Sequence, residues 1–330
     1  MYVPIETRLD QQEQGSEIVG GDLRALARAI TLVENRDPAA ISILRAVFPY
    51  TGRALKIGIT GPPGVGKSTL AGCIAPEYRK QGHRVAILAI DPSSPYTGGA
   101  MLGDRIRMQR LGCDPGTYIR SMATRGHLGG LASTSAEVLD LLDAAGFSRI
   151  LIESVGAGQD EIDIANVANA LVVVVTPGLG DSVQLMKSGL HEVADVYAIN
   201  KCDYADSESI ENDVRASLEL RARSDGWRIP IALASATRGL GIASLIQLIE
   251  AYFHFLQQTG LAQKKLVRRW RERIMSDVRK AIQRRVLSDE WGKCLLEYAR
   301  QVVDKRANPY GLLPQLVVKI TQSTEQTTAV

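Results

Sequence analysis

The sequence predicts an α/β protein in which helices cover both faces of a mostly parallel sheet. Two observations carry this prediction. Between about residues 51 and 257, short apolar runs alternate with helical stretches, as in parallel sheets whose strands are joined by helices. The first apolar run also leads through a glycine-rich loop, residues 61–68, directly into a helical stretch. We therefore expect a ligand site at the carboxyl ends of the strands, where open α/β sheets present their ligands.

Apolar spacing predicts the individual elements in chain order. Leu23–Leu32 and Pro38–Phe48 have helical spacing and form an N-terminal helical cap within residues 1–50. Ala54–Ile59 is the first strand, and Ser68–Arg79 is the helix that follows the glycine-rich loop. The later strands are expected at Arg84–Asp91, Tyr118–Met122, Arg149–Ser154, Leu171–Thr176, Val196–Asn200 and Ile229–Ser235.

Beyond Gly260 the predicted strands stop and a helical region begins. Apolar residues recur every four positions along one long helix, and a second helix, Trp291–Val303, ends before Asn308-Pro309. We therefore divide the chain into a helical extension (1–50), a nucleotide-binding domain (51–257) and a C-terminal helical region (258–330). The apolar stripe of the long helix comprises Leu266, Trp270, Ile274, Val278, Ile282 and Val286.

Composition is that of a soluble globular protein, with 45% hydrophobic and 23% charged residues. The formal net charge of +3 is too small to indicate a nucleic-acid partner, and no apolar run is long enough to span a membrane. The first twenty residues lack a signal-peptide pattern, and four dispersed cysteines fit a reducing cytoplasm. Lysines and arginines are dense between residues 264 and 285. We interpret them as the solvated reverse of the apolar stripe, against the alternative of a nucleic-acid or acidic-membrane surface.

The glycine-rich loop has the residue types of a phosphate-binding loop. Its glycines allow successive backbone N–H groups to point inward at phosphate oxygens, while the helix that follows directs its positive end at the anion. Lys67 places a cation on the outer phosphates, and the Ser68 hydroxyl suits Mg²⁺. The predicted phosphate-binding residues are Gly61, Pro62, Pro63, Gly64, Val65, Gly66, Lys67, Ser68 and Thr69.

A second motif, Asn200-Lys201-Cys202-Asp203, follows the predicted strand at residues 196–200 and identifies the base. The carboxylate of Asp203 can accept hydrogen bonds from N1–H and the exocyclic amine of guanine, a pair that adenine does not offer. Ser235-Ala236, after another strand, resembles the last signature of GTP-binding proteins. Asn200, Lys201, Asp203, Ser235 and Ala236 are therefore predicted to bind the nucleotide, and GTP is favoured over ATP.

Three carboxylates fall at or near the same edge of the predicted sheet. Asp91 and Glu153 each close a strand, and Asp104 follows soon after the first of these strands. Carboxylates beside a triphosphate make sense with Mg²⁺ between them, because Mg²⁺ favours oxygen ligands. Each acid taken alone is also an acceptable helix N-cap.

With these motifs the chain resembles the MeaB/ArgK/MMAA family of P-loop GTPases, chaperones of adenosylcobalamin-dependent acyl-CoA mutases. The resemblance is densest in Asp91–Met108, Ser121–Gly130, Glu153–Glu161 and Pro177–Gly189. It implies a homodimer joined through the C-terminal helices. It also implies GTP-gated delivery of adenosylcobalamin to the mutase, and protection or repair of the mutase's cofactor.

The resemblance also assigns roles to individual residues. Lys67 and Ser68 match the phosphate and Mg²⁺ positions, while Asp91, Asp104 and Glu153 match the acidic metal-region positions. In the segment 177–189 the polar residues that would couple nucleotide state to the mutase are Asp181, Gln184 and Lys187. Tyr96, where the family usually has Arg, and several residues of 177–189 depart from the family pattern. These departures leave the identity of the partner mutase open.

The residues that accelerate hydrolysis are less defined by the sequence. Gln159 either orients the attacking water or is a loop residue bonded to backbone, and Arg107 and Arg125 are the candidates for an arginine finger. We expect slow intrinsic hydrolysis that the mutase accelerates.

Two other classes of function remain as alternatives. A nickel-delivery GTPase would share the fold but needs clustered Cys or His, and this chain has four of each, scattered. A kinase of the kind once attached to the ArgK name would use the same loop with ATP. For a mutase chaperone, the client is open among methylmalonyl-, isobutyryl-, ethylmalonyl- and 2-hydroxyisobutyryl-CoA mutases.

Overall fold

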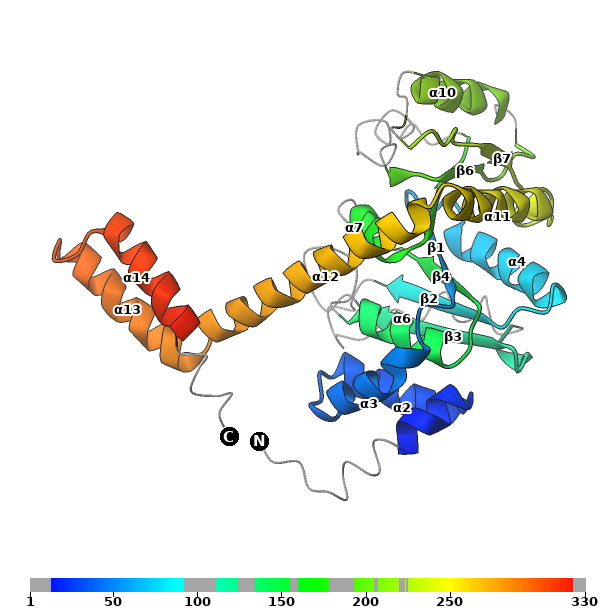
Figure 1. The fold of residues 1–330 in the computed structure, drawn as a ribbon. Coiled ribbons are helices and arrows are strands. Elements are labelled where there is room, and N and C mark those ends of the chain that lie inside the picture. Colours follow the sequence, from blue (N-terminus) through cyan, green and yellow to red (C-terminus); the bar gives the residue numbers. More distant parts are fainter. Residues whose placement is uncertain are drawn as a thin grey trace. The chain divides into compact units, whose positions relative to one another are not determined.

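The computed structural model describes residues 13–91, 111–123, 134–154, 160–177, 193–204, 207–219, 223 and 225–322 of the chain. The chain forms two compact units, residues 1–262 and residues 263–330. Figure 1 labels their helices and strands.

A parallel sheet forms the centre of the first unit. Within the described residues it has seven strands in the order β3-β2-β4-β1-β5-β6-β7, and every neighbouring pair is parallel. Ile59 in the central strand pairs with Glu153 on one side and with Val172 on the other. The loops after these strands therefore meet at one edge of the sheet. The strands are β1 (Leu55–Thr60), β2 (Val85–Asp91), β3 (Thr117–Ala123), β4 (Arg149–Glu153), β5 (Ala170–Val175), β6 (Val196–Ile199) and β7 (Ile231–Leu233).

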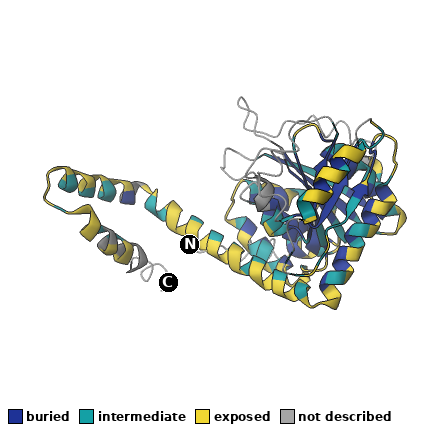
Figure 2. Ribbon diagram, turned by 90° about the horizontal axis from the view of Figure 1, so that it is seen from above, coloured by how far each residue is buried: buried dark blue, intermediate teal, exposed yellow. Residues whose placement is uncertain are grey.

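Helices cover both faces of this sheet, and each face has its own hydrophobic core. Alternate residues of β1 show the division: Ile57 and Ile59 belong to one core, whereas a Cβ on Gly58 would touch Ile164 in the other. One face is covered by α4 (Lys67–Lys80) and α11 (Ile242–Gln258). The other is covered by α2 (Leu23–Glu34), α3 (Ala39–Val47), α6 (Ser135–Ala144), α7 (Asp160–Val167) and α10 (Ser207–Glu219). The inner strands β2, β4, β5 and β6 are buried almost throughout, which explains their continuous apolar runs, whereas the edge strands β3 and β7 are partly exposed (Figure 2).

The N-terminal helices are part of the same core as the sheet. Asp22 caps α2 by accepting hydrogen bonds from the N–H groups of Arg24 and Ala25. The chain then returns to the sheet through Gly52 and Ala54, whose N–H groups donate to the buried carboxylate of Asp143 on α6. This carboxylate fixes the start of β1 and hence the direction from which β1 enters the site.

The second unit is helical. It contains α12 (Leu261–Val286, beginning two residues before the boundary between the units), α13 (Asp289–Val303) and α14 (Pro309–Gln322). The predicted helix Trp291–Val303 ends at Val303 as expected, and Asn308-Pro309 begins a further helix that was not predicted. The Asn308 side chain accepts a hydrogen bond from the N–H of Tyr310, and Pro309 occupies the first helical position, where its missing N–H costs nothing.

Most strand boundaries differ from the prediction by a single residue, and the last strand differs more. The last strand was expected over Ile229–Ser235, but β7 covers Ile231–Leu233 alone. Ser235 instead forms an isolated bridge with Leu240, because the chain turns back on itself there. This turn places Ser235 and its neighbours beside the end of β6.

Candidate nucleotide-binding site

The glycine-rich loop connects β1 to α4 and is packed against the strands beside it. Gly61, Gly64 and Gly66 all have positive φ, at 142°, 80° and 92°. A Cβ on Gly61 would lie 2.2 Å from the carbonyl oxygen of Val174, and one on Gly66 would lie 2.5 Å from the amide nitrogen of Asn200. Both positions therefore exclude any larger residue, whereas Gly64 has open space and needs glycine only for its backbone conformation.

Lys67, the first residue of α4, places its ammonium group inside the curve of the loop. Its Nζ donates to the carbonyl oxygens of Gly61 at 2.8 Å and Pro62 at 3.0 Å, and the residue is buried. Pro63 and Gly64 form the exposed rim, while Val65 is buried beneath it. Thr69, on the first turn of α4, is half-buried. The loop thus has the glycine conformations, the cation and the helix N-terminus that a phosphate site requires.

Asn200 joins the glycine-rich loop to the loops after β6 and β7. Its side-chain Nδ2 donates to the carbonyl oxygen of Val65 at 2.8 Å, and its Oδ1 accepts from the N–H of Ala236 at 3.0 Å. Lys201 has a left-handed backbone, φ 59°, and its Nζ donates to the carbonyl oxygen of Gly64 at 2.9 Å. These bonds hold together three loops that are up to 171 residues apart in the sequence.

Asp203 lies at this junction with a mostly buried side chain. Its Oδ2 forms an ion pair with Nε of Arg238 at 3.1 Å, whereas Oδ1 is buried without a hydrogen-bond partner. The hydroxyl of Ser235 is the main cause that lowers the pKa of the Asp203 carboxyl; burial opposes this shift and the cation of Arg238 adds to it. An ionised carboxylate with a free buried oxygen is suited to accept the N–H groups of guanine.

The predicted magnesium site is described in part. The hydroxyl of Ser68 donates to Oε1 of Glu153, which is buried at the end of β4. Asp91 ends β2 two residues beyond Ala89, which pairs with Glu153. A serine hydroxyl and a carboxylate are oxygen donors that suit Mg²⁺, which keeps several waters in such sites, so the residues present fit this ion. Among the described residues no group of three or more His, Cys, Asp or Glu could hold a metal.

Several predicted site residues lie outside the described part of the chain. They are Asp104, Arg107, Arg125, Gln159, Asp181, Gln184 and Lys187, together with Tyr96. The side chain of Asp91 is likewise not described.

The structure adds residues that sequence reasoning missed. Arg238 pairs with Asp203, the Ser154 hydroxyl donates to the hydroxyl of Thr60 at 2.9 Å, and the thiol of Cys73 donates to the carbonyl oxygen of Ala236 at 3.1 Å. The Thr60–Ser154 bond joins the ends of β1 and β4 beneath the phosphate loop. No local sequence pattern predicts these contacts, because each joins two segments that are distant in the sequence and adjacent only in the folded chain.

The fold and the site together define a P-loop protein that binds guanine nucleotide. The chain also matches, over residues 26–291, the model of the family described as methylmalonyl-CoA mutase-associated GTPase MeaB. This chain belongs to that family, and it is a GTPase.

Curated relatives agree with this assignment. A Pyrococcus abyssi protein named as a GTPase is 44% identical over 91% of this chain and 94% of its own length. GTPase ArgK of Escherichia coli is 36% identical over 74% of this chain and 76% of its own. The mouse methylmalonic aciduria type A homolog, a mitochondrial protein, is also 36% identical, over 75% of this chain and 64% of its own.

A solved structure confirms the fold over nearly the whole chain. The crystal structure of a LAO/AO transport system kinase superposes with a TM-score of 0.72 at 24% identity, covering 97% of this chain and 100% of that one. Among the described residues, no helix has the length and apolar character needed to cross a membrane.

Proposed function

We propose that this GTPase is a nucleotide-gated chaperone of an adenosylcobalamin-dependent acyl-CoA mutase. The proposal rests on the match of residues 26–291 to a family described as associated with methylmalonyl-CoA mutase. The mouse relative, whose name refers to methylmalonic aciduria, supports the same class of client. In this role, GTP binding and hydrolysis gate the delivery of adenosylcobalamin to the mutase and the protection or repair of its cofactor. We expect the protein to work in the cytoplasm.

In this proposal, different residues bind the phosphates, the Mg²⁺ ion and the base of GTP. The N-terminus of α4 and the loop N–H groups favour the phosphates, and Lys67 exchanges its two carbonyl acceptors for phosphate oxygens. Ser68 and Glu153 would hold Mg²⁺, which when bound offsets the charge of the β- and γ-phosphates. Asp203 selects guanine, and Asn200 makes the base loop and the phosphate loop one unit. A change from GTP to GDP should therefore affect the phosphate loop and the base loop together.

The partner-coupling role is proposed for the segment 177–189, with Asp181, Gln184 and Lys187 as its polar contacts. This segment follows β5, whose Val174 carbonyl oxygen packs against Gly61 of the phosphate loop. Because β5 is in direct contact with the phosphate loop, we expect a change at the phosphates to be transmitted through β5 to the segment 177–189. Asp104, Arg107 and Gln159 are proposed to serve hydrolysis.

A homodimer through the C-terminal helices is the second part of the proposal. On α12 the apolar side chains Val267, Ile274, Val278 and Ile282 are exposed. At about 100° per residue, these positions lie within roughly 80° of one another on the helix, so they make one apolar face. The stripe predicted from the sequence, in which apolar residues recur every four positions, shifts around the helix axis by about 40° from one residue to the next. An apolar face of this kind on a long helix suits a second copy of the same helix.

The test is GTP turnover in the presence of each candidate client. Purified protein is assayed alone and with methylmalonyl-, isobutyryl-, ethylmalonyl- or 2-hydroxyisobutyryl-CoA mutase, and binding is compared with GDP and with a non-hydrolysable GTP analogue. We expect one mutase to accelerate turnover and to bind differently in the two nucleotide states. If none changes turnover or cofactor loading, the chaperone role is rejected while GTP binding stands.

A matched variant shows whether nucleotide is the cause. Asp203→Asn exchanges the guanine-accepting carboxylate for an amide, which pairs with xanthine in place of guanine. With this variant, the effect on the mutase should disappear with GTP and return with XTP.

A further inference from the structure

The loop after β7 is held in one conformation by its own backbone. Ser235 and Leu240 exchange two hydrogen bonds, N–H to O at 3.0 Å and 3.1 Å, and the N–H of Arg238 donates to the carbonyl oxygen of Ser235 at 3.1 Å. Gly239 and Gly241 have positive φ, and a Cβ on Gly241 would lie 1.9 Å from the carbonyl oxygen of Leu233. The direction in which residue 238 leaves this turn is therefore fixed.

Arg238 uses this position to reach the carboxylate of Asp203 from another loop. Its Nε lies 3.1 Å from Oδ2, and the arginine side chain is 63% exposed whereas that of Asp203 is 11% exposed. The other carboxylate oxygen, Oδ1, is buried and has no hydrogen-bond partner. One oxygen is thus paired with a cation at the surface, and the other is buried.

We propose that Arg238 is a positioning residue for guanine recognition, which fixes the orientation and the charge of the Asp203 carboxylate without itself being a base ligand. Two N–H groups of guanine must meet two oxygens of one carboxylate, so a carboxylate free to rotate pays a conformational cost on binding. An ion pair at Oδ2 removes much of that rotation and still leaves this oxygen a lone pair for the base. The inference rests on guanine-nucleotide binding and does not depend on the mutase.

The charge state supports the same role. Burial alone would raise the pKa of Asp203, and a protonated carboxyl would present one acceptor fewer to guanine. The Ser235 hydroxyl first, and the Arg238 cation in addition, lower this pKa. Both groups come from the same turn, residues 235–240. Within this proposal, the turn acts on guanine through Asp203.

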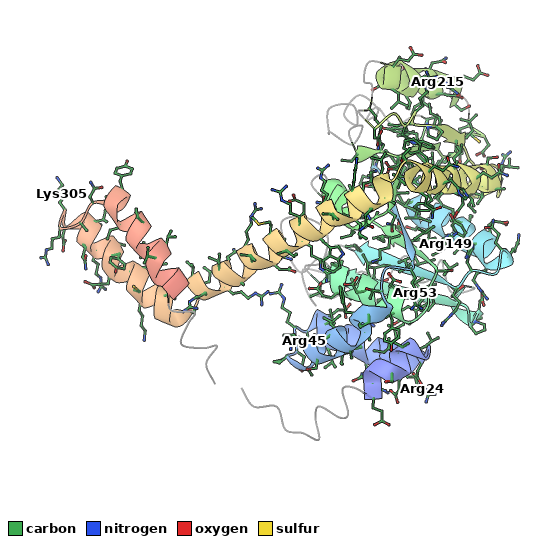
Figure 3. The ribbon with its side chains drawn as sticks, in the orientation of Figure 1. Arg24, Arg45, Arg53, Arg149, Arg215 and Lys305 are labelled. Carbon is green, nitrogen blue, oxygen red and sulfur yellow. The ribbon has the colours of Figure 1, made fainter. Side chains whose placement is uncertain are left out.

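The experiment measures GDP affinity by titration calorimetry for wild type, Arg238→Ala and Arg238→Lys. Because the arginine of this ion pair is largely exposed, we expect a loss of roughly two- to fivefold in the alanine variant. Lysine keeps the charge but not the planar fork, so we expect it to recover part of the loss. Arg215→Ala is the matched control: Arg215 is also an exposed arginine paired with an acid, Glu211, on α10 (Figure 3), and its removal should leave GDP affinity unchanged.

A double-mutant cycle separates positioning from loop structure. In the Asp203→Asn background, measured with XDP, there is no carboxylate for Arg238 to hold, so Arg238→Ala should have no further effect. An equal loss of affinity in both backgrounds would assign Arg238 to the loop structure and overturn the proposal. An unchanged GDP affinity in Arg238→Ala would do the same.

Discussion

Asn200 donates its side-chain amide to the carbonyl oxygen of Val65 at 2.8 Å, so the residue that opens the base motif also closes the phosphate loop. The same side chain accepts the N–H of Ala236. Because Asn200 is buried, its loss leaves both backbone groups without these partners inside the protein.

Asn200→Ala should therefore weaken nucleotide binding and stability together. We expect a loss of about 1–3 kcal/mol in the free energy of unfolding, since two buried polar groups lose a partner. Thermal unfolding and GDP titration measure the two effects. Asn169→Ala is the control, because Asn169 accepts the N–H of Lys56 at the opposite end of β1 and should affect stability alone. A variant that loses stability and binds GDP normally would contradict the linking role.

Gly61→Ala should abolish nucleotide binding through packing alone. The added Cβ would lie 2.2 Å from the Val174 carbonyl oxygen, and backbone of a buried strand cannot give way cheaply. Gly72→Ala makes the same chemical change inside α4, where nothing lies within 4 Å. That control should gain about 0.4–1 kcal/mol of stability and bind GDP as wild type does. Binding of GDP by Gly61→Ala at wild-type affinity would refute the packing argument.

Glu153→Gln should raise the Mg²⁺ concentration needed for half-maximal GTP hydrolysis. The carboxylate that meets the Ser68 hydroxyl becomes a neutral amide, and we expect a shift of roughly tenfold or more. The measurement is hydrolysis rate against Mg²⁺ concentration. Glu250→Gln is the control. Glu250 lies on α11, and its carboxylate is paired with Arg149, which Figure 3 labels, so this variant should leave the Mg²⁺ dependence unchanged. Equal Mg²⁺ curves for Glu153→Gln and wild type would remove Glu153 from the metal site.

The lowered pKa of His83 predicts how the free energy of unfolding depends on pH. Burial first, and then the charge of Arg149, lower the pKa of this histidine below its ordinary value of 6.5. The unfolded chain therefore binds the proton more readily than the folded one, so the free energy of unfolding is highest above about pH 6.5 and falls as pH drops below it. Thermal unfolding between pH 5 and 7.5 should show a shallower slope for His83→Gln than for wild type. Identical slopes would show that another group is responsible.

Ile274→Glu should convert the proposed dimer to a monomer. The substitution puts a charge in the middle of the exposed apolar face of α12, where a second copy would bury it. Arg279→Glu introduces the same side chain away from that face and is the control. Light scattering gives the mass of each, and a wild-type protein that is already monomeric would reject the dimer.

Local patterns were sufficient for most of the elements. The apolar run that predicted Arg149–Ser154 became β4 at Arg149–Glu153, and the run at Val196–Asn200 became β6 at Val196–Ile199. Periodicity within one segment reports which faces are buried, and that information is local. The exceptions also have local causes: Asn308-Pro309 begins a further helix, α14, after the confirmed end of α13, and the turn at Ser235 shortens β7.

The sequence by itself determined that a glycine-rich loop of the P-loop type and the Asn200–Asp203 motif follow strands of one parallel sheet, because glycine spacing and residue type identify both motifs. Only the tertiary structure decided that β4 lies between β1 and β2, that Asn200 holds Val65, and that Arg238 reaches Asp203. Strand order and contacts between distant loops depend on how separate segments pack against a common core. No single segment of sequence contains that information.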